Sequence, residues 1–120
     1  MKQIMLSVVA VVALLGAVGA RAQDPVKVDP KHYTVEFEND QVRVLRIHYA
    51  PGEKSVMHVH PDSVAVFLND QTAKFTFPDG KSEEAPMKAG TSKFLPGGPH
   101  LPENIGTGPL DVVLVELKKK

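Results

Sequence analysis

Three histidines carry the chemistry that this sequence is best equipped to perform. His58 and His60 are separated by one residue in a stretch of strand-forming residues, and His100 follows a proline–glycine turn. Because successive side chains of a strand point to opposite faces, the first two imidazoles project the same way. Neutral imidazole is the commonest metal ligand in proteins, so this spacing predicts a three-histidine metal site with open coordination positions.

A His-x-His pair has a second interpretation, the polar face of an ordinary strand, because short motifs recur by chance. The sequence around the pair helps to distinguish a metal site from a polar strand face. Turn residues recur about every eight to twelve positions, and short runs rich in valine, phenylalanine, isoleucine, tyrosine and threonine lie between them, which is typical of a β-sandwich or small barrel. We expect eight strands and no helix, with strands at residues 33–37, 42–49, 55–60, 64–68, 73–77, 82–87, 91–95 and 110–117.

One predicted strand is apolar on both of its faces. It contains the run Val112-Val113-Leu114-Val115. A strand of this kind is covered by the opposite sheet on one side and by another subunit or a loop on the other. We therefore expect a homodimer.

The first 22 residues do not belong to the predicted fold. Lys2 precedes an apolar run over residues 4–18, and small residues stand at Ala20 and Ala22. This pattern predicts a secretory signal peptide at residues 1–22, cleaved after Ala22, with an uncleaved anchor as the alternative. The mature chain would have 120 − 22 = 98 residues, enough for one domain: a lead-in segment at 23–32 and a barrel at 33–120. We expect a periplasmic or secreted protein.

Composition excludes several other functions. Without Lys2 and Arg21, the 14 basic and 14 acidic residues become 12 and 14, so there is no basic surface for nucleic acid and no stable membrane association is expected after cleavage. The chain has no cysteine, which removes disulfides and thiol catalysis. It also lacks the GxSxG, P-loop and GxGxxG motifs.

Two spaced sets of residues surround the histidines. One is a glycine, five residues and His-x-His; the other is a glycine, five residues, a proline–glycine turn, a histidine and, three residues on, an asparagine. The first set is Gly52, His58 and His60, and the second is Gly90, Pro96, Gly98, His100 and Asn104. Together they resemble the two motifs of the cupin superfamily, with one residue in place of two between Gly98 and His100. The resemblance spans residues 33–117 and implies a single-domain, all-β double-stranded β-helix, or jelly-roll barrel.

The chain departs from the superfamily pattern at the glutamate ligand. Val64 and Ala65 occupy the two positions where that glutamate would stand, and the following glycine is also missing. The resemblance therefore implies a centre with only His58, His60 and His100 as ligands of one divalent transition metal: Fe, Zn, Mn, Ni, Co or Cu. Such a neutral set leaves the charge of the ion uncompensated, which favours an anionic substrate or hydroxide in the open positions.

Other polar residues have secondary places in this prediction. Glu103 and His48 are candidates for a catalytic acid or base, although a solvated loop carboxylate and a surface or core histidine are the simpler interpretations. We expect Asn104 to bond backbone near its turn rather than the metal. Glu116 and Arg46 stand in apolar strands, where they either pair with each other or line the barrel. The remaining histidine, His32, receives no role.

Two hypotheses of function follow from the sequence. The first is a metal-dependent enzyme that acts on a small molecule, with dioxygenase-like or Lewis-acid chemistry, as the resemblance to three-histidine cupin dioxygenases implies. The second is a non-catalytic periplasmic module that binds a small ligand or the metal itself. An acid or base beside the metal would favour isomerisation or hydrolysis, and its absence would favour oxygen chemistry or binding.

Overall fold

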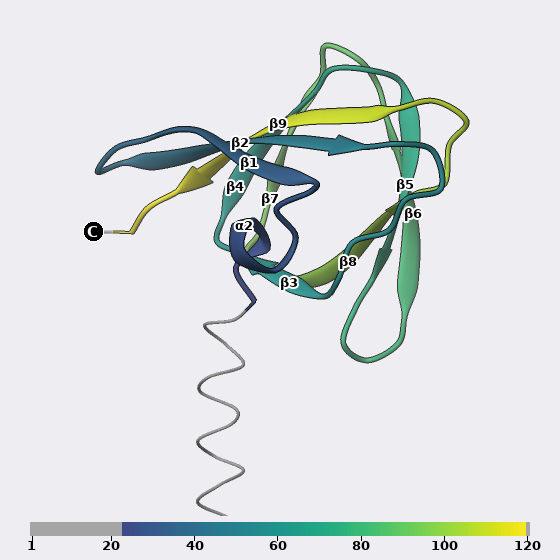
Figure 1. The fold of residues 1–120 in the computed structure, drawn as a ribbon, viewed down its shortest axis with the longest axis horizontal. Coiled ribbons are helices and arrows are strands. Elements are labelled where there is room, and N and C mark those ends of the chain that lie inside the picture. The colour runs from purple at the N-terminus through teal and green to yellow at the C-terminus, as the bar shows by residue number, and fades with distance from the viewer. Residues whose placement is uncertain (1–22, 120) are drawn as a thin grey trace, which may run out of the picture.

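Two antiparallel sheets enclose the interior of this protein in the computed structural model, which describes residues 23–119 (Figure 1). The predicted signal peptide lies outside the described residues. The nine strands are β1 (Tyr33–Glu38), β2 (Val42–Tyr49), β3 (His58–His60), β4 (Ser63–Phe67), β5 (Gln71–Thr76), β6 (Ser82–Met87), β7 (Ser92–Leu95), β8 (Gly98–Asn104) and β9 (Leu110–Leu117). Residues 23–119 contain no helical segment with the length and hydrophobicity of a membrane span.

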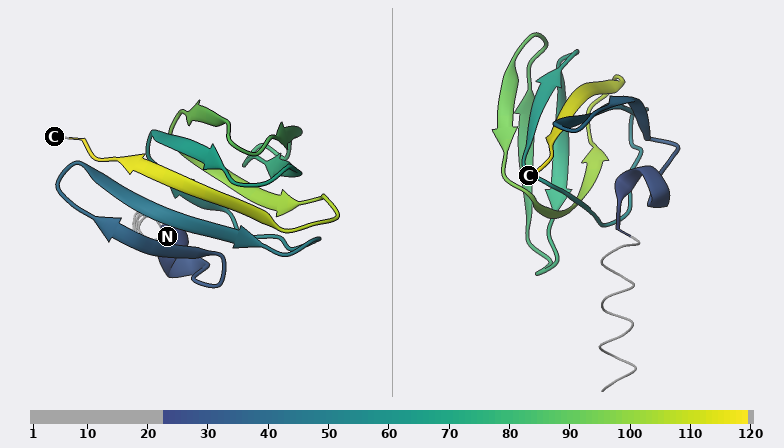
Figure 2. Two further views of the ribbon diagram at one scale, coloured as in Figure 1. Left: turned by 90° about the horizontal axis from the view of Figure 1, so that it is seen from above. Right: turned by 90° about the vertical axis from the view of Figure 1, so that its left-hand side faces the viewer.

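The strand order explains how distant segments meet. The larger sheet has the order β1-β2-β9-β4-β7 and the smaller one β3-β8-β5-β6, and every pair is antiparallel. Seen from above, β1, β2, β9 and β4 lie side by side as one layer (Figure 2). The arrangement is the predicted all-β, double-stranded β-helix barrel.

The core lies between the two sheets. Alternate residues of β2 and β9 point inward, so that Leu45 and Leu114 are 0% and 2% exposed. Ala65 of β4 and Ala73 of β5 pack into the same cluster. These two small side chains also line a cavity in the interior.

The predicted turns that precede the histidines are present. Gly52 and Gly90 have φ angles of +79° and +81°, in the region where residues with a Cβ are strained. Both glycines therefore allow a sharp reversal before a strand that leads to the site.

Two elements differ from the prediction. Residues 98–104, expected as a loop, form β8, whose first half pairs with β3 and whose second half pairs with β5 on one side and with a bridge at Lys54 on the other. Pro102 has no N–H to donate but still takes part in the pairing, because its carbonyl accepts the N–H of Ser55 at 2.9 Å. The lead-in segment contains a one-turn helix, α2 (Pro25–Val28), with Asp24 as its N-cap; proline at the first helical position is favourable and was a missed signal.

Candidate metal centre

Strands β3 and β8 bring the three predicted histidines together. His58 and His100 are direct cross-strand partners, and His60 lies opposite Gly98. One nitrogen of each ring lies within 4.8 Å of one nitrogen of each of the other two. His100 thus reaches the site from within a strand, not from the expected loop. Two nitrogens bonded to one ion at about 2.0–2.1 Å can be at most about 4.2 Å apart, so the widest pair would close by a few tenths of an ångström around a shared metal.

The outer ring nitrogens fix the orientation of two imidazoles. The Nδ1 of His58 donates to the carbonyl oxygen of Val56 at 2.8 Å, and the Nδ1 of His60 donates to a carboxylate oxygen of Glu116 at 2.7 Å. Each ring therefore turns its Nε2 toward the other. Ligating histidines in metalloproteins are held by this kind of second hydrogen bond.

The inner nitrogens fit a cation. The Nε2 atoms of His58 and His60 are 3.0 Å apart, and with both Nδ1 atoms serving as donors, two neutral rings would direct two lone pairs at each other. The Nε2 of His100 is buried without a hydrogen-bond partner. A buried polar atom without a partner is costly, and one ion among the three nitrogens satisfies all of them.

Burial keeps two of these rings in the form that binds metal. Loss of solvent, together with the nearby His60, lowers the pKa of His58 to about 4. The same cause, with His60 and His58 as neighbours, lowers the pKa of His100 to about 3. Both imidazoles are therefore neutral near pH 7, and deprotonated nitrogen is what a metal requires.

Glu116 supports the site from outside the ligand set. It is 3% exposed and accepts hydrogen bonds from His60 and from the Nε of Arg43, both at 2.7 Å. Burial alone would raise its pKa, but these two partners hold the pKa below its ordinary value. The chain thus lacks the glutamate ligand of β4 and instead has an ionised carboxylate bonded to a ligand histidine.

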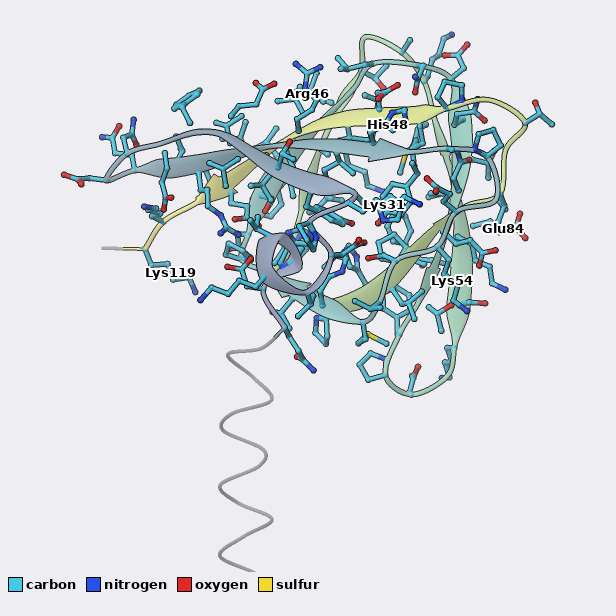
Figure 3. The ribbon with its side chains drawn as sticks, in the orientation of Figure 1. Lys31, Arg46, His48, Lys54, Glu84 and Lys119 are labelled. Atoms are coloured by element: carbon cyan, nitrogen blue, oxygen red, sulfur yellow. The ribbon has the colours of Figure 1, made fainter. Side chains whose placement is uncertain are left out.

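The predicted pairing of Glu116 with Arg46 is wrong. Arg46 bonds Glu36 at 2.9 Å and projects away from the barrel (Figure 3). Arg43 is the cross-strand partner of Glu116. Counting in twos from the buried Leu45 places Arg43 inside and Arg46 outside, so strand parity could have found the correct partner.

The two candidate acid–base residues lie away from the histidine cluster. The side chain of His48 is 57% exposed and bonds Asp111 at 2.6 Å. Glu103 lies on the face of β8 opposite to His100, because the two are an odd number of residues apart. Asn104 is fully buried and bonds backbone, donating to the carbonyls of Tyr49 and Gly108.

A cavity of about 250 Å³ opens on the histidine cluster. His60 and His100 form part of its wall, and most of the remainder is apolar, including Phe67, Phe75 and Leu114. Phe75 stacks on His100 with ring centroids 5.1 Å apart. Open coordination positions of an ion held here would therefore face a small apolar chamber.

The comparisons with known proteins agree with the fold. No protein-family model and no curated protein matches the chain. Among solved structures, it is similar to a cupin domain from Bordetella pertussis, with 27% identity, a TM-score of 0.68 and coverage of 72% of this chain and 92% of that one. A protein with a double-stranded β-helix domain from Klebsiella pneumoniae has 25% identity, a TM-score of 0.55 and coverage of 73% and 84%. An RmlC-like cupin from Methanocaldococcus jannaschii shares the fold at 20% identity, with a TM-score of 0.57 and coverage of 74% and 83%.

Proposed function

Because this chain belongs to the cupin superfamily, we propose that it holds one divalent transition-metal ion on His58, His60 and His100 and that the ion binds a small, largely apolar molecule through an oxygen atom. The observation that carries the proposal is the meeting of three buried imidazole nitrogens, one without any hydrogen-bond partner, at the wall of an apolar cavity.

The cavity and the charges indicate the kind of molecule. A volume of about 250 Å³ equals roughly eight water molecules at about 30 Å³ each, so the ligand has on the order of ten non-hydrogen atoms. Three neutral imidazoles leave the charge of the ion uncompensated, and the carboxylate of Glu116 already faces the guanidinium of Arg43. An anionic oxygen on an apolar body, as in a small carboxylic acid or a phenol, fits both conditions.

The surroundings of the site favour oxygen chemistry. Both oxygens of Glu116 are engaged by His60 and Arg43, and His48 and Glu103 lie outside the cavity lining. Among the described residues that line the cavity, the one carboxylate is that of Glu83, which is exposed on β6, so no buried carboxylate or further histidine of this lining is placed to move a proton of a bound molecule. A redox-active ion supplies dioxygen activation without such a group. We therefore propose a metal-dependent oxygenase-type enzyme.

The second candidate is a binding module for a small ligand or the metal, favoured by the same lack of a buried carboxylate in the described cavity lining. Residues 1–22 support the proposal that either function operates in the periplasm or outside the cell. Export is tested by comparing the N-terminal sequence of protein isolated from the cell envelope with cleavage after Ala22.

Metal binding is tested with cobalt(II) on the metal-free protein. We expect one ion per chain for wild type and for His48→Ala, a surface control, and a loss of at least tenfold in affinity for His100→Ala. Equal affinity of His100→Ala and wild type would contradict the site. Oxygen uptake by the iron(II)-loaded protein with small carboxylic acids and phenols then separates the two candidates: uptake that depends on the added compound supports the enzyme, and binding without uptake supports the module.

A further inference from the structure

The residues that precede the barrel lie along the strand that carries two of the three histidines. β3 has three residues and forms the edge of the smaller sheet, where β8 is its neighbour. On the other edge, the backbone N–H of Val59 donates to the carbonyl of Gln23 at 2.9 Å. Helix α2 packs against β1 and β3 (Figure 1). Residues 23–29, called the N-terminal segment below, therefore supply a hydrogen-bond acceptor and packing contacts to the short edge strand β3.

A chain of charged contacts runs from this segment to His60. Both carboxylate oxygens of Asp24 accept hydrogen bonds from Arg43, at 2.9 and 3.0 Å. Arg43 donates its Nε to Glu116, and Glu116 accepts the Nδ1–H of His60. Bidentate arginine–carboxylate pairs fix position as well as charge. Asp24 thus sets the place of the guanidinium that orients the carboxylate on His60.

A second chain runs from the segment to His58. The hydroxyl of Ser55 donates to Asp29 at 2.5 Å and lies 3.3 Å from the Nδ1 of His58. A carboxylate oxygen of Asp29 also forms a hydrogen bond with the Nδ1 of His32 at 2.7 Å. Asp29 and Ser55 are 9% and 7% exposed, so these contacts are shielded from solvent. The two chains start at opposite ends of the segment and end on different histidines.

We propose that the N-terminal segment positions His58 and His60, so that docking of the segment and binding of the metal stabilise each other. The inference rests on the proposed metal site. Asp24, Arg43, Ser55 and Asp29 are positioning residues in this account, since each acts through a neighbour. Coupling between two binding events is reciprocal: loosening the segment weakens metal binding, and metal binding tightens the segment.

The first test compares Asp24→Asn with Glu36→Gln by zinc affinity, measured in competition with a chelator. Asparagine keeps the helix cap but loses the charge that holds Arg43, while Glu36→Gln breaks an ion pair of similar length on the outer face. We expect the dissociation constant to rise about tenfold for Asp24→Asn, the lower end of the range for residues that support ligands, and less than twofold for Glu36→Gln.

The second test needs no variant and follows amide hydrogen exchange of wild type with and without zinc. We expect zinc to slow exchange of residues 26–33 at least fivefold, and Ser55→Ala to reduce that protection. If wild type binds zinc but Asp24→Asn binds it equally well and exchange in the segment is unchanged, the coupling is wrong and the metal site stands. If wild type binds no zinc, cobalt or iron, the proposed function and this inference both fail.

A separate observation concerns the outer face of the larger sheet. One row of cross-strand partners crosses all five strands and is entirely apolar: Phe37, Val44, Val115, Val64 and Phe94. The two phenylalanines at its ends are 55% and 53% exposed. At about 4.8 Å between strands, the row extends about 19 Å. The row is symmetric in residue type, with a phenylalanine at each end, valines between them and Val115 at the centre.

Charged side chains on this face have partners within the chain. Arg46 and Glu36 form an ion pair at 2.9 Å, and Asp111 is hydrogen-bonded to His48 at 2.6 Å and to the side-chain amide of Asn69 at 2.8 Å. A second copy placed on the face therefore meets side chains that already have partners. In a two-fold dimer the same patch contacts itself, and an axis through Val115 places Phe37 against Phe94 of the partner subunit. We infer that this outer face is the contact surface of a homodimer, with the two larger sheets packed face to face.

Sedimentation over roughly 1–100 µM subunit tests the dimer. Phe94→Asp is compared with Val56→Asp, which introduces the same charge at an apolar residue that is 47% exposed and precedes β3 of the other sheet. We expect a dimer for wild type and Val56→Asp and a monomer for Phe94→Asp. A wild-type protein that is monomeric at the highest concentration would overturn the inference. A Phe94→Asp variant that is still a dimer would also overturn it.

Discussion

Acidification of the metal-free protein should destabilise it through two buried histidines. The pKa of His58 is lowered to about 4 and that of His100 to about 3, whereas an unfolded histidine titrates near about 6.5. Between these values the unfolded chain binds protons that the folded chain does not. The contribution of these two histidines to the free energy of unfolding is therefore fully present above about pH 6.5, and it decreases as the pH falls toward 4.

The magnitude follows from these values. Between pH 7 and pH 5, linkage gives a loss of about 1.5–2 kcal/mol for each histidine, or about 3–4 kcal/mol for the pair. A domain of ordinary stability, at about 5–15 kcal/mol, would lose a large part of its margin. Substituting His100 by glutamine removes one of the two titrating groups, so the loss should fall to about half.

Urea unfolding of the chelator-treated protein at pH 7, 6 and 5, followed by circular dichroism, measures this loss. His48→Gln is the control, because the histidine that it replaces is on the surface, and it should change the loss by less than about 0.5 kcal/mol. An unfolding free energy that stays constant from pH 7 to pH 5, or a His100→Gln variant with the full wild-type dependence, would refute the view that the two rings are buried in the neutral form.

Three further predictions concern the site and its support. Glu116→Gln weakens the hydrogen bond that orients His60 and should raise the cobalt(II) dissociation constant about 10- to 100-fold; an unchanged constant would argue that the carboxylate has no effect on the ligand. Ala65→Leu extends a side chain into the cavity and should abolish the spectral response of the cobalt-loaded protein to benzoate, with cobalt uptake unchanged; a retained response would place the ligand elsewhere. Gly90→Ala forces a Cβ at φ +81° and should cost about 1–2 kcal/mol in urea unfolding with normal cobalt affinity.

Much of the fold could be predicted from local signals. The strands predicted at 73–77 and 110–117 correspond to β5 and β9, and His58 and His60 share a face because of strand parity alone. The strand at 98–104 was missed, because its prolines normally argue against a strand. Only the tertiary arrangement, which places β3 beside the first half of β8 and β5 beside the second, gives these residues their ladder partners.

The support around the histidines was less accessible to sequence reasoning. Glu116 lies 56 residues from His60 along the chain, and the route from Asp24 through Arg43 to that carboxylate joins three distant segments. Nothing local distinguishes these side chains from surface charges. Their roles depend on the order of strands in the sheet, which places β2 beside β9 and β9 beside β4.

X-ray absorption spectroscopy of the cobalt- or zinc-loaded protein, at one ion per chain, shows which atoms bind the metal. We expect three imidazole nitrogens at about 2.0–2.1 Å from the ion, with one imidazole lost in His100→Ala and none lost in His48→Ala. A spectrum with fewer than three imidazoles, or one dominated by carboxylate oxygens, would contradict the three-histidine centre.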